Sequence, residues 1–186
     1  SRVFSYLLLT RGIDKDVLFE FVKNKMIYES ADYHNAVFVG YDLNGIPHHA
    51  HKRGTVTSNS YKGNVAGSQL EFSFHWHGTS DKMFLFEAPI DMLSYISMHK
   101  DNWQRHSYAA SCSVSDRVLF QCLKDNPNIK NVFLCFDNDE AGQTANKRIA
   151  DKLNIQNEIL IPTHKDWNED LTLSEKGDER ICHQVL

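Results

Sequence analysis

From about residue 79 onward, short apolar runs alternate with stretches of helical periodicity. The runs are MFLF, SYAAS, NVFLCF and EILI, and a helix-like pattern follows each of the first three. Such alternation is typical of parallel strands, because their connections must cross the sheet and usually do so as helices. This region therefore predicts an α/β fold with a mainly parallel sheet, right-handed crossovers and helices on both faces.

The expected helices have recognisable ends. Ser113 and Asp116 have the spacing of a capping box at the start of a helix over 115–125, and Asn126-Pro127 ends that helix. Further helices are expected over residues 90–99 and 141–153.

The first 78 residues follow a different pattern, which predicts a small α+β subdomain. Two short helices open it, and Asp14 is expected to cap the second. A hairpin is expected around Asn44-Gly45, because this dipeptide fits a tight turn between antiparallel strands. Residues 70–77, LEFSFHWH, alternate strictly and predict a half-buried strand. The Ser- and Asn-rich stretch between the hairpin and this run predicts an exposed loop.

The composition excludes some classes of protein. With 41% hydrophobic and 24% charged residues, the chain has the composition of a folded globular protein. No apolar stretch approaches the roughly 20 residues that span a bilayer and no signal-peptide pattern opens the chain, so we expect a cytoplasmic protein without membrane contact. The chain starts without Met inside an apolar pattern, which indicates a fragment of a longer protein. The net charge of -4 leaves any nucleic-acid contact to a local basic patch.

Soft metal ligands are few. The four cysteines form no Cys-x-x-Cys pair, and we interpret them as reduced core residues without a structural zinc site. His75 and His77 share one face of the expected strand, but no third ligand is evident, so both are expected at the surface.

Acidic side chains follow three of the expected strands, at the point where each strand ends. In open α/β sheets the ligand site lies beyond the carboxyl ends of the strands, so we expect these acids to lie together. They are Glu87 and Asp91 after MFLF, Asp137, Asp139 and Glu140 after NVFLCF, and Asp166, Glu169 and Asp170 after EILI.

Asp137 and Asp139 are candidate metal ligands. Residues two apart in an extended segment point the same way, so both carboxylates can face one point while Asn138 faces away. Carboxylate ligands suit Mg²⁺ or Mn²⁺, and metals held in this way commonly bind phosphate oxygens. Each acid alone is also an ordinary turn or N-cap residue, and only the set of three strand ends favours a metal site. Glu140 is expected in the first turn of the next helix rather than among the ligands.

Three motifs resemble the Toprim fold, which bacterial primases share with type IA and type II topoisomerases and some nucleases. Glu87-Ala-Pro-Ile-Asp91 resembles its ExxxD element, Asp137-Asn-Asp139-Glu-Ala-Gly142 its DxDxAG element, and Lys165-Asp-Trp-Asn-Glu-Asp-Leu171 the third acidic element of primases. The combination is similar to Toprim proteins of bacterial conjugative and other mobile elements, whose N-terminal part is a domain of unknown function. The resemblance implies a Rossmann-like Toprim catalytic domain over 79–186, after an N-terminal subdomain over 1–78 that lines a nucleic-acid groove.

The resemblance further implies a Mg²⁺- or Mn²⁺-dependent, DNA primase-like nucleotidyltransferase that acts in DNA replication. Asp137, Asp139 and Asp166 would hold metal ions, and Glu87 would either join them or transfer a proton with the support of Asp91. The implied partners are a single-stranded DNA or RNA/DNA template, nucleoside triphosphates and a helicase or relaxase.

Two departures from the family leave other functions open. Ala88 stands where Gly is usual, and Asn168 where replicative primases usually have a second Asp, so a second metal is expected to bind more weakly. A Toprim nuclease or nickase would use the same centre with water as the nucleophile. A non-catalytic accessory module of a relaxase or helicase would bind nucleic acid without turnover.

One basic cluster lies in the second arm of the expected hairpin. Alternation puts His49, His51 and Arg53 on one face of that strand and Lys52 on the other. Cationic groups in such an arm can contact a phosphate backbone, and a solvated surface strand is the alternative. The predicted nucleic-acid-binding set is Arg11, His49, His51, Lys52, Arg53 and Lys62.

Overall fold

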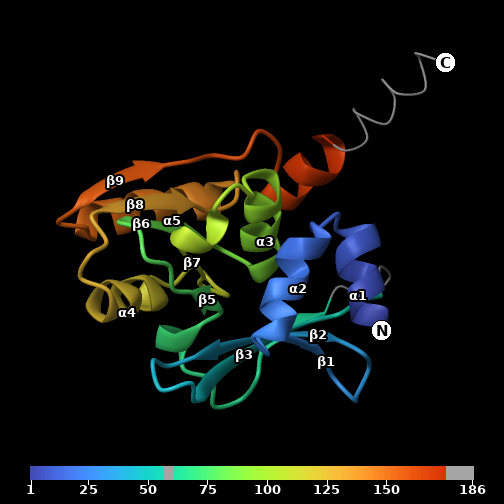
Figure 1. Ribbon diagram of the computed structural model, residues 1–186. Helices are drawn as coiled ribbons and strands as arrows, with labels where there is room; N and C mark the ends of the chain where they lie inside the picture. The colour runs from blue at the N-terminus through green and yellow to red at the C-terminus, as the bar shows by residue number, and fades with distance from the viewer. Residues whose placement is uncertain (57–60, 175–186) are drawn as a thin grey trace.

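Two β-sheets and the helices packed against them form the fold. The structure is a computed structural model that describes residues 1–56 and 61–174 (Figure 1). Cys182 and part of the expected loop lie outside the described residues. The first sheet has the strand order β1-β2-β3-β4, and the second has the order β5-β7-β6-β8-β9. In the described part of the chain, no helix is long and apolar enough to cross a membrane.

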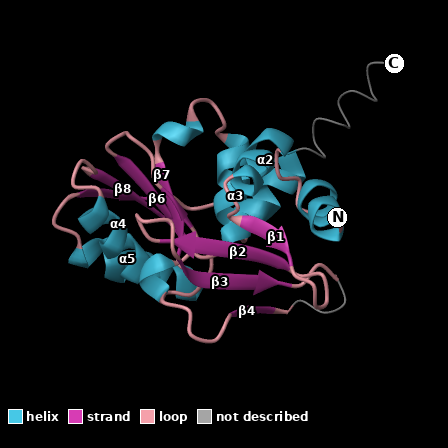
Figure 2. Ribbon diagram, turned by 60° about the horizontal axis from the view of Figure 1, so that its bottom comes forward, coloured by secondary structure: helices cyan, strands magenta, loops and turns pink. Residues whose placement is uncertain are grey.

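The N-terminal part consists of helices followed by an antiparallel sheet. Helix α1, Arg2–Ser5, continues as a π-helix over Tyr6–Thr10, and α2 spans Lys15–Lys23. As predicted, Asp14 caps α2, because its carboxylate accepts hydrogen bonds from the amides of Asp16 at 2.9 Å and Val17 at 3.2 Å. The strands are β1 Ile27–Glu29, β2 Ala36–Tyr41, β3 Pro47–Arg53 and β4 Lys62–Asn64, and neighbours pair antiparallel (Figure 2).

The hairpin around Asn44-Gly45 is confirmed by the pairing of β2 with β3. Asp42 stabilises its turn, since Oδ1 accepts hydrogen bonds from the amides of Asn44 and Ile46, both at 2.9 Å. The prediction of an exposed loop after the hairpin was wrong for β4, which pairs with the end of β3. Pairing satisfies backbone groups that β3 would otherwise leave at a sheet edge.

The second sheet is mainly parallel, as predicted. Strand β6 lies at its centre and pairs in parallel with β7 and β8, while β9 extends the parallel part beyond β8. Its strands are β5 His75–Trp76, β6 Lys82–Phe86, β7 Ser107–Ala110, β8 Asn131–Cys135 and β9 Gln156–Ile159. The helices are α3 Pro89–Met98, α4 Arg117–Asp125 and α5 Glu140–Lys152, and residues 167–174 are also helical.

Alternate residues of β6 face two different helical layers. Phe84 and Phe86 belong to a core that includes residues of α2 and α3. Met83 and Leu85 belong to a second core with residues of α4 and α5. This alternation with a period of two confirms that helices cover both faces of the sheet.

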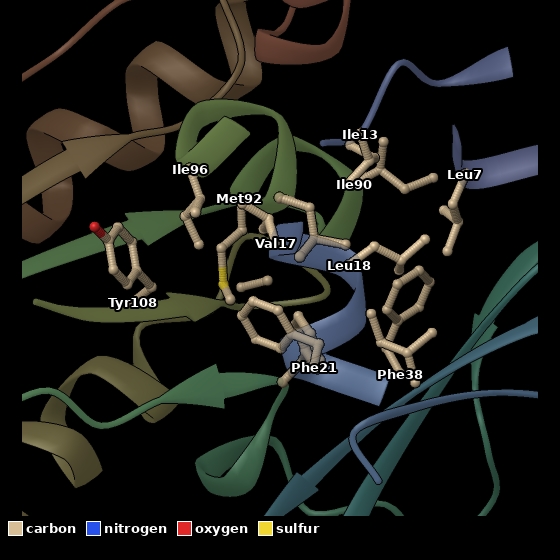
Figure 3. Close-up of a cluster of buried hydrophobic side chains, with 14 of the residues drawn as sticks. Leu7, Ile13, Val17, Leu18, Phe21, Phe38, Ile90, Met92, Ile96 and Tyr108 are labelled. Atoms are coloured by element: carbon tan, nitrogen blue, oxygen red, sulfur yellow. The ribbon is translucent and has the colours of Figure 1, made fainter. Parts of the chain in front are cut away.

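The N-terminal part and the second sheet share the first of these cores. The ring of Phe21 in α2 lies 5.3 Å from the ring of Phe74, next to β5, and 5.3 Å from that of Trp103. Phe38 of β2 lies 5.4 Å from Phe74 on another side. Figure 3 shows Phe21 and Met92 of α3 directed into the same cluster. Burial of these rings therefore holds the two sheets together.

Residues 70–77 do not form the continuous strand that their alternation predicts. Leu70–Phe72 form a 3-10 helix, and only His75–Trp76 extend as β5, antiparallel to β7. The cause is close packing over β2, where a Cβ atom on Gly40 would lie 1.7 Å from the carbonyl oxygen of Phe72. The backbone crosses so closely there that tertiary packing overrides the local pattern.

The predicted capping box before α4 was also wrong. The helix begins after Asp116, which makes no side-chain cap. Ser113 instead belongs to a preceding turn, where its hydroxyl oxygen accepts a hydrogen bond from the Ser115 amide at 3.1 Å. Asn126 ends α4 as predicted.

Candidate metal and nucleic-acid site

A polar cavity of about 280 Å³ lies at the carboxyl ends of β6 and β8. Its charged lining combines carboxylates with cations from distant parts of the sequence. The carboxylates are Glu87, Asp91, Asp137 and Asp166, and the cations are Arg11, Arg53, Lys62 and Lys165. The structure thus brings acids from three strand ends together with basic side chains of the first sheet, of the end of the first helical segment and of the loop before residues 167–174.

Each carboxylate lies just after a strand, or at the start of the helix that follows the strand. Glu87 directly follows β6, and Asp91 lies in the first turn of α3. Asp137 comes shortly after β8, and Asp166 precedes the helical residues 167–174. Parallel strands end at one edge of their sheet, so this topology converges side chains far apart in the chain.

Burial raises the pKa of three of these carboxyl groups. Asp91 is 7% exposed, and this burial raises its pKa well above the ordinary range. The charge of Asp137 raises the pKa of Asp91 further. Burial raises the pKa of Glu87, and the charge of Asp139 adds to the effect. Burial raises the pKa of Asp137 to about 7, with further contributions from Glu87 and from the neighbouring acids. Burial and mutual repulsion therefore make it unfavourable for all of these carboxyl groups to be ionised at the same time.

The cavity fits a hard divalent cation. Asp137 Oδ1 is buried and has no hydrogen-bond partner among the described residues. A bound cation would satisfy this oxygen and offset the repulsion among the carboxylates. Carboxylate oxygens are the ligands that Mg²⁺ and Mn²⁺ prefer.

Asp139 caps α5 and does not line the cavity. Its Oδ1 accepts a hydrogen bond from the Gly142 amide at 2.8 Å, so this oxygen is turned toward the helix. Its charge still contributes to raising the pKa of Glu87 and Asp137. Asp139 and Glu140 line a neighbouring surface hollow. The expected place of Glu140 in the first turn of α5 is confirmed, and a ligand role for Asp139 stays a prediction.

Gly142 permits α5 to begin directly against Asp137. A Cβ atom at Gly142 would lie 2.3 Å from the carbonyl oxygen of Asp137 and 3.0 Å from its amide nitrogen. Every other residue type would push the helix or the Asp137 backbone away. The glycine of this motif therefore has a positioning effect on the acid five residues before it.

The basic strand divides between two surfaces, as its alternation predicts. His51 and Arg53 line the cavity, and Arg53 Nε is buried without a hydrogen-bond partner in the described part of the chain. Lys52 points to the other side, where its Nζ lies 3.3 Å from Asp32 Oδ2. Burial lowers the pKa of His51, so this side chain is neutral near pH 7.

His49 does not reach the cavity. It is 3% exposed, and burial lowers its pKa to about 4, so it is neutral and has no access to a phosphate backbone. Sequence reasoning also missed Lys165 as a cavity cation. The available signal was its position next to Asp166.

Asn168 connects buried groups around the cavity. Its side-chain amide donates a hydrogen bond to Ser94 Oγ at 2.9 Å, and its backbone amide donates to Asp91 Oδ1 at 3.3 Å. A further pair of hydrogen bonds joins it to Arg11. The departure from the primase motif at this position thus coincides with a structural role, which sequence reasoning did not find.

We expected both His75 and His77 at the surface. This was wrong for His75 of β5, which is 6% exposed. Burial lowers its pKa to about 4, so its imidazole is neutral at pH 7. Cys122 of α4 lies beside the two histidines, a proximity that the sequence did not reveal. Ligand atoms of His75, His77 and Cys122 all lie within 4.8 Å of one another. Among the described residues no other group of three or more His, Cys, Asp or Glu side chains is this compact, the acids of the cavity included.

Comparison with known families accounts for most of the chain. Residues 5–80 match the family described as a protein of unknown function (DUF3991), and residues 84–171 match the family described as Toprim-like. The chain therefore matches the DUF3991 family in its first part and the Toprim-like family in its second part. This confirms the predicted resemblance, including the N-terminal domain of unknown function.

A relative from Bacillus anthracis, the uncharacterized protein pXO2-78, is 24% identical to this chain over 205 residues. The similarity covers 97% of this chain and 59% of the relative. The chain therefore spans less than two thirds of that relative's length.

Several solved primase structures have the same fold as this chain. The primase fragment of the bacteriophage T7 primase-helicase protein gives a TM-score of 0.67 at 20% identity, covering 95% of this chain and 72% of that one. The DnaG catalytic core gives 0.62 at 12% identity, covering 98% and 73%. A DnaG primase catalytic domain bound to ssDNA gives 0.60 at 13% identity, covering 95% and 70%. The predicted fold class is confirmed.

Proposed function

We propose that this chain is the core of a Mg²⁺- or Mn²⁺-dependent, DNA primase-like nucleotidyltransferase. The observation that carries the proposal is the cavity in which Glu87, Asp137 and Asp166 meet four cationic side chains. Carboxylates alone repel phosphate, and cations alone do not hold a metal ion. A surface that offers both suits a triphosphate together with its divalent cation.

The acids would divide between holding the cation and moving a proton. Asp137 and Asp166, with Asp139 from the adjoining cap, would hold the divalent cation. When bound, this cation would offset the charge of phosphate oxygens during transfer. Glu87, with its raised pKa, would either join that set or accept the proton of the attacking hydroxyl group. Asp91, which is 7% exposed and lines the same cavity, would support its position.

The cations would hold the nucleic acid and the incoming nucleotide. Arg53 has a buried Nε without a partner among the described residues, which a phosphate oxygen would satisfy. Arg11, Lys62 and Lys165 share the same cavity and would add further phosphate contacts. The template would lie along β3 and β4, on the face that carries Arg53.

The biological setting is part of the proposal. One structural neighbour belongs to a primase-helicase protein, and another is bound to ssDNA. We infer that this chain acts in the cytoplasm on a single-stranded or RNA/DNA template, in replication of a mobile element, with a helicase or relaxase as partner.

A primer-extension gel tests the proposal. The chain is incubated with Mn²⁺ or Mg²⁺, labelled single-stranded DNA with and without an annealed primer, and nucleoside triphosphates. We expect longer, metal-dependent products, and loss of those products in Asp137→Asn. The matched control is Asp151→Asn, which makes the same change at an exposed acid of α5 that does not line the cavity.

The same gel separates the alternatives. Shortened labelled strands that need the metal but no nucleotides would show a nuclease or nickase. Strand binding that persists in EDTA, with neither longer nor shorter products, would show an accessory module. Either result would overturn the proposal of nucleotidyl transfer.

A further inference from the structure

We propose that His75, His77 and Cys122 form a structural zinc site, separate from the acidic cavity. Their ligand atoms all lie within 4.8 Å of one another. In a tetrahedral zinc site with bonds of about 2.0–2.3 Å, ligand atoms lie about 3.3–3.8 Å apart. Small side-chain rotations would close that difference.

The two histidines share one face of the sheet edge. Residues two apart in an extended segment point the same way, and His75 pairs with Ala109, which belongs to the core under α4. Cys122 is a buried residue of α4 in that same core. The strand and the helix therefore present their ligands to a common point.

The hydrogen bond of His75 leaves the correct nitrogen for a metal. Its Nδ1 lies 2.6 Å from the carbonyl oxygen of Ser73 and must carry the proton, because a carbonyl oxygen only accepts. Nε2 is then the unprotonated nitrogen with a free lone pair. Metal-ligating histidines commonly have this arrangement, in which a backbone carbonyl fixes the tautomer and the ring orientation.

Asp125 is an acidic residue of the helix that carries Cys122. It lies three residues after Cys122 and so on the same face of α4. Its charge acts on the pKa of His75, His77 and Cys122 alike. A hydrogen bond from Gln121 Nε2 to Asp125 Oδ1 at 2.9 Å orients it.

The donor atoms select zinc over the cation of the acidic cavity. Imidazole nitrogen and thiolate sulfur suit Zn²⁺, whereas Mg²⁺ prefers oxygen. On binding, the Cys122 thiol would release its proton to solvent and form a Zn–S bond. The ion would join α4 to the β5 edge and hold the segment that runs over Gly40.

Cobalt substitution and zinc analysis of the whole chain test this inference. We expect about one Zn²⁺ per chain and, after EDTA treatment and Co²⁺ addition, visible absorption of tetrahedral Co²⁺ with a thiolate-to-metal charge-transfer band. Cys122→Ser should abolish that band and weaken Zn²⁺ binding at least tenfold. His77→Ala should weaken binding similarly, and it alters an exposed side chain, so folding is expected to persist.

Three controls make the result decisive. Cys112→Ser changes a free cysteine elsewhere, and His99→Ala changes an exposed histidine elsewhere, and both should keep the band. Asp137→Asn should also keep it, which separates this site from the proposed catalytic centre. Absence of the band in the unaltered chain, its persistence in Cys122→Ser, or its loss in Asp137→Asn would overturn the inference.

Discussion

Arg11 and Asn168 bind each other through two hydrogen bonds. Nη1 of Arg11 donates to Asn168 Oδ1 at 3.1 Å, and Nδ2 of Asn168 donates to the backbone oxygen of Arg11 at 2.8 Å. The pair ties the N-terminal helices to the segment that carries Asp166. An aspartate could accept the first bond but has no donor for the second, so only asparagine forms both.

Asn168→Asp should destabilise the metal-free protein. The change removes the donors to Arg11 and Ser94 and places a charge beside the buried Asp91. We expect a loss of about 1–3 kcal/mol in the free energy of unfolding, or roughly 2–12 °C in Tm. Thermal unfolding in EDTA measures it, with the exposed Asn154→Asp as control. Equal Tm values for the two variants would refute the connecting role.

Asp137→Asn should stabilise the protein in EDTA. The folded-state pKa of Asp137 is about 7 against an ordinary 3.8, so between these values the folded protein binds more protons than the unfolded chain. Its contribution to the free energy of unfolding therefore falls as pH rises from about 4 to 7, and the loss persists above pH 7. The amide cannot ionise and escapes this loss.

At pH 8 we expect Asp137→Asn to increase the free energy of unfolding by about 1–2 kcal/mol, a value discounted because solvent screens a partly exposed group. At pH 4 the gain should disappear, and added Mn²⁺ should stabilise the unaltered chain more than the variant. Denaturant unfolding at both pH values measures these effects. A gain that is the same at pH 4 and pH 8 would show that the ionisation of Asp137 is not its source.

Gly142→Ala should destabilise the protein, although alanine is the better helix former by about 1 kcal/mol. The added Cβ atom would lie 2.3 Å from the Asp137 carbonyl oxygen and displace one of the two segments. We expect a lower Tm together with weaker Mn²⁺ binding, measured by thermal unfolding and calorimetric titration. Thr144→Ala, at an exposed position of α5, should leave Mn²⁺ binding unchanged and should not lower Tm. A Gly142→Ala protein with raised Tm would contradict the close approach.

Arg53→Gln and Lys52→Gln should differ in their effect on nucleic-acid binding. The two residues are neighbours in β3, but Arg53 lines the cavity and Lys52 pairs with Asp32 on the other side. Arg53→Gln should weaken binding of single-stranded DNA and reduce the salt slope by about one. Lys52→Gln should change neither by a comparable amount, and fluorescence anisotropy across a salt series measures both. Equal losses of affinity in the two variants would show that the single-stranded DNA contacts both faces of β3.

The sequence revealed those features of the fold that depend on local periodicity and on topology. Parallel strands read as short apolar runs, and their common edge made a cluster of Asp137, Asp166 and Glu87 predictable. Features that depend on contacts across the chain stayed hidden. The alternation of residues 70–77 could not show that Phe72 crosses Gly40, because that contact exists only after β2 and β5 have packed.

The same limit hid the partners of polar side chains. Cys122 reads as one more apolar position of α4, and only the crossover under β5 brings it to His75. From the sequence, Asn168 looks like a weaker metal ligand in place of an aspartate. Its hydrogen bond to the backbone oxygen of Arg11 becomes evident only in the folded chain. Donor and acceptor pairs of this kind have no periodicity to reveal them.

The contacts among the rings of Phe21, Phe74 and Trp103 have a consequence for how this protein can be divided. The DUF3991 and Toprim-like matches meet near residue 80, yet the aromatic cluster draws on both sides of that point. Expressing residues 84–171 alone would expose this cluster to water. We therefore expect the two matched regions to be inherited, expressed and unfolded together, as halves of one cooperative unit.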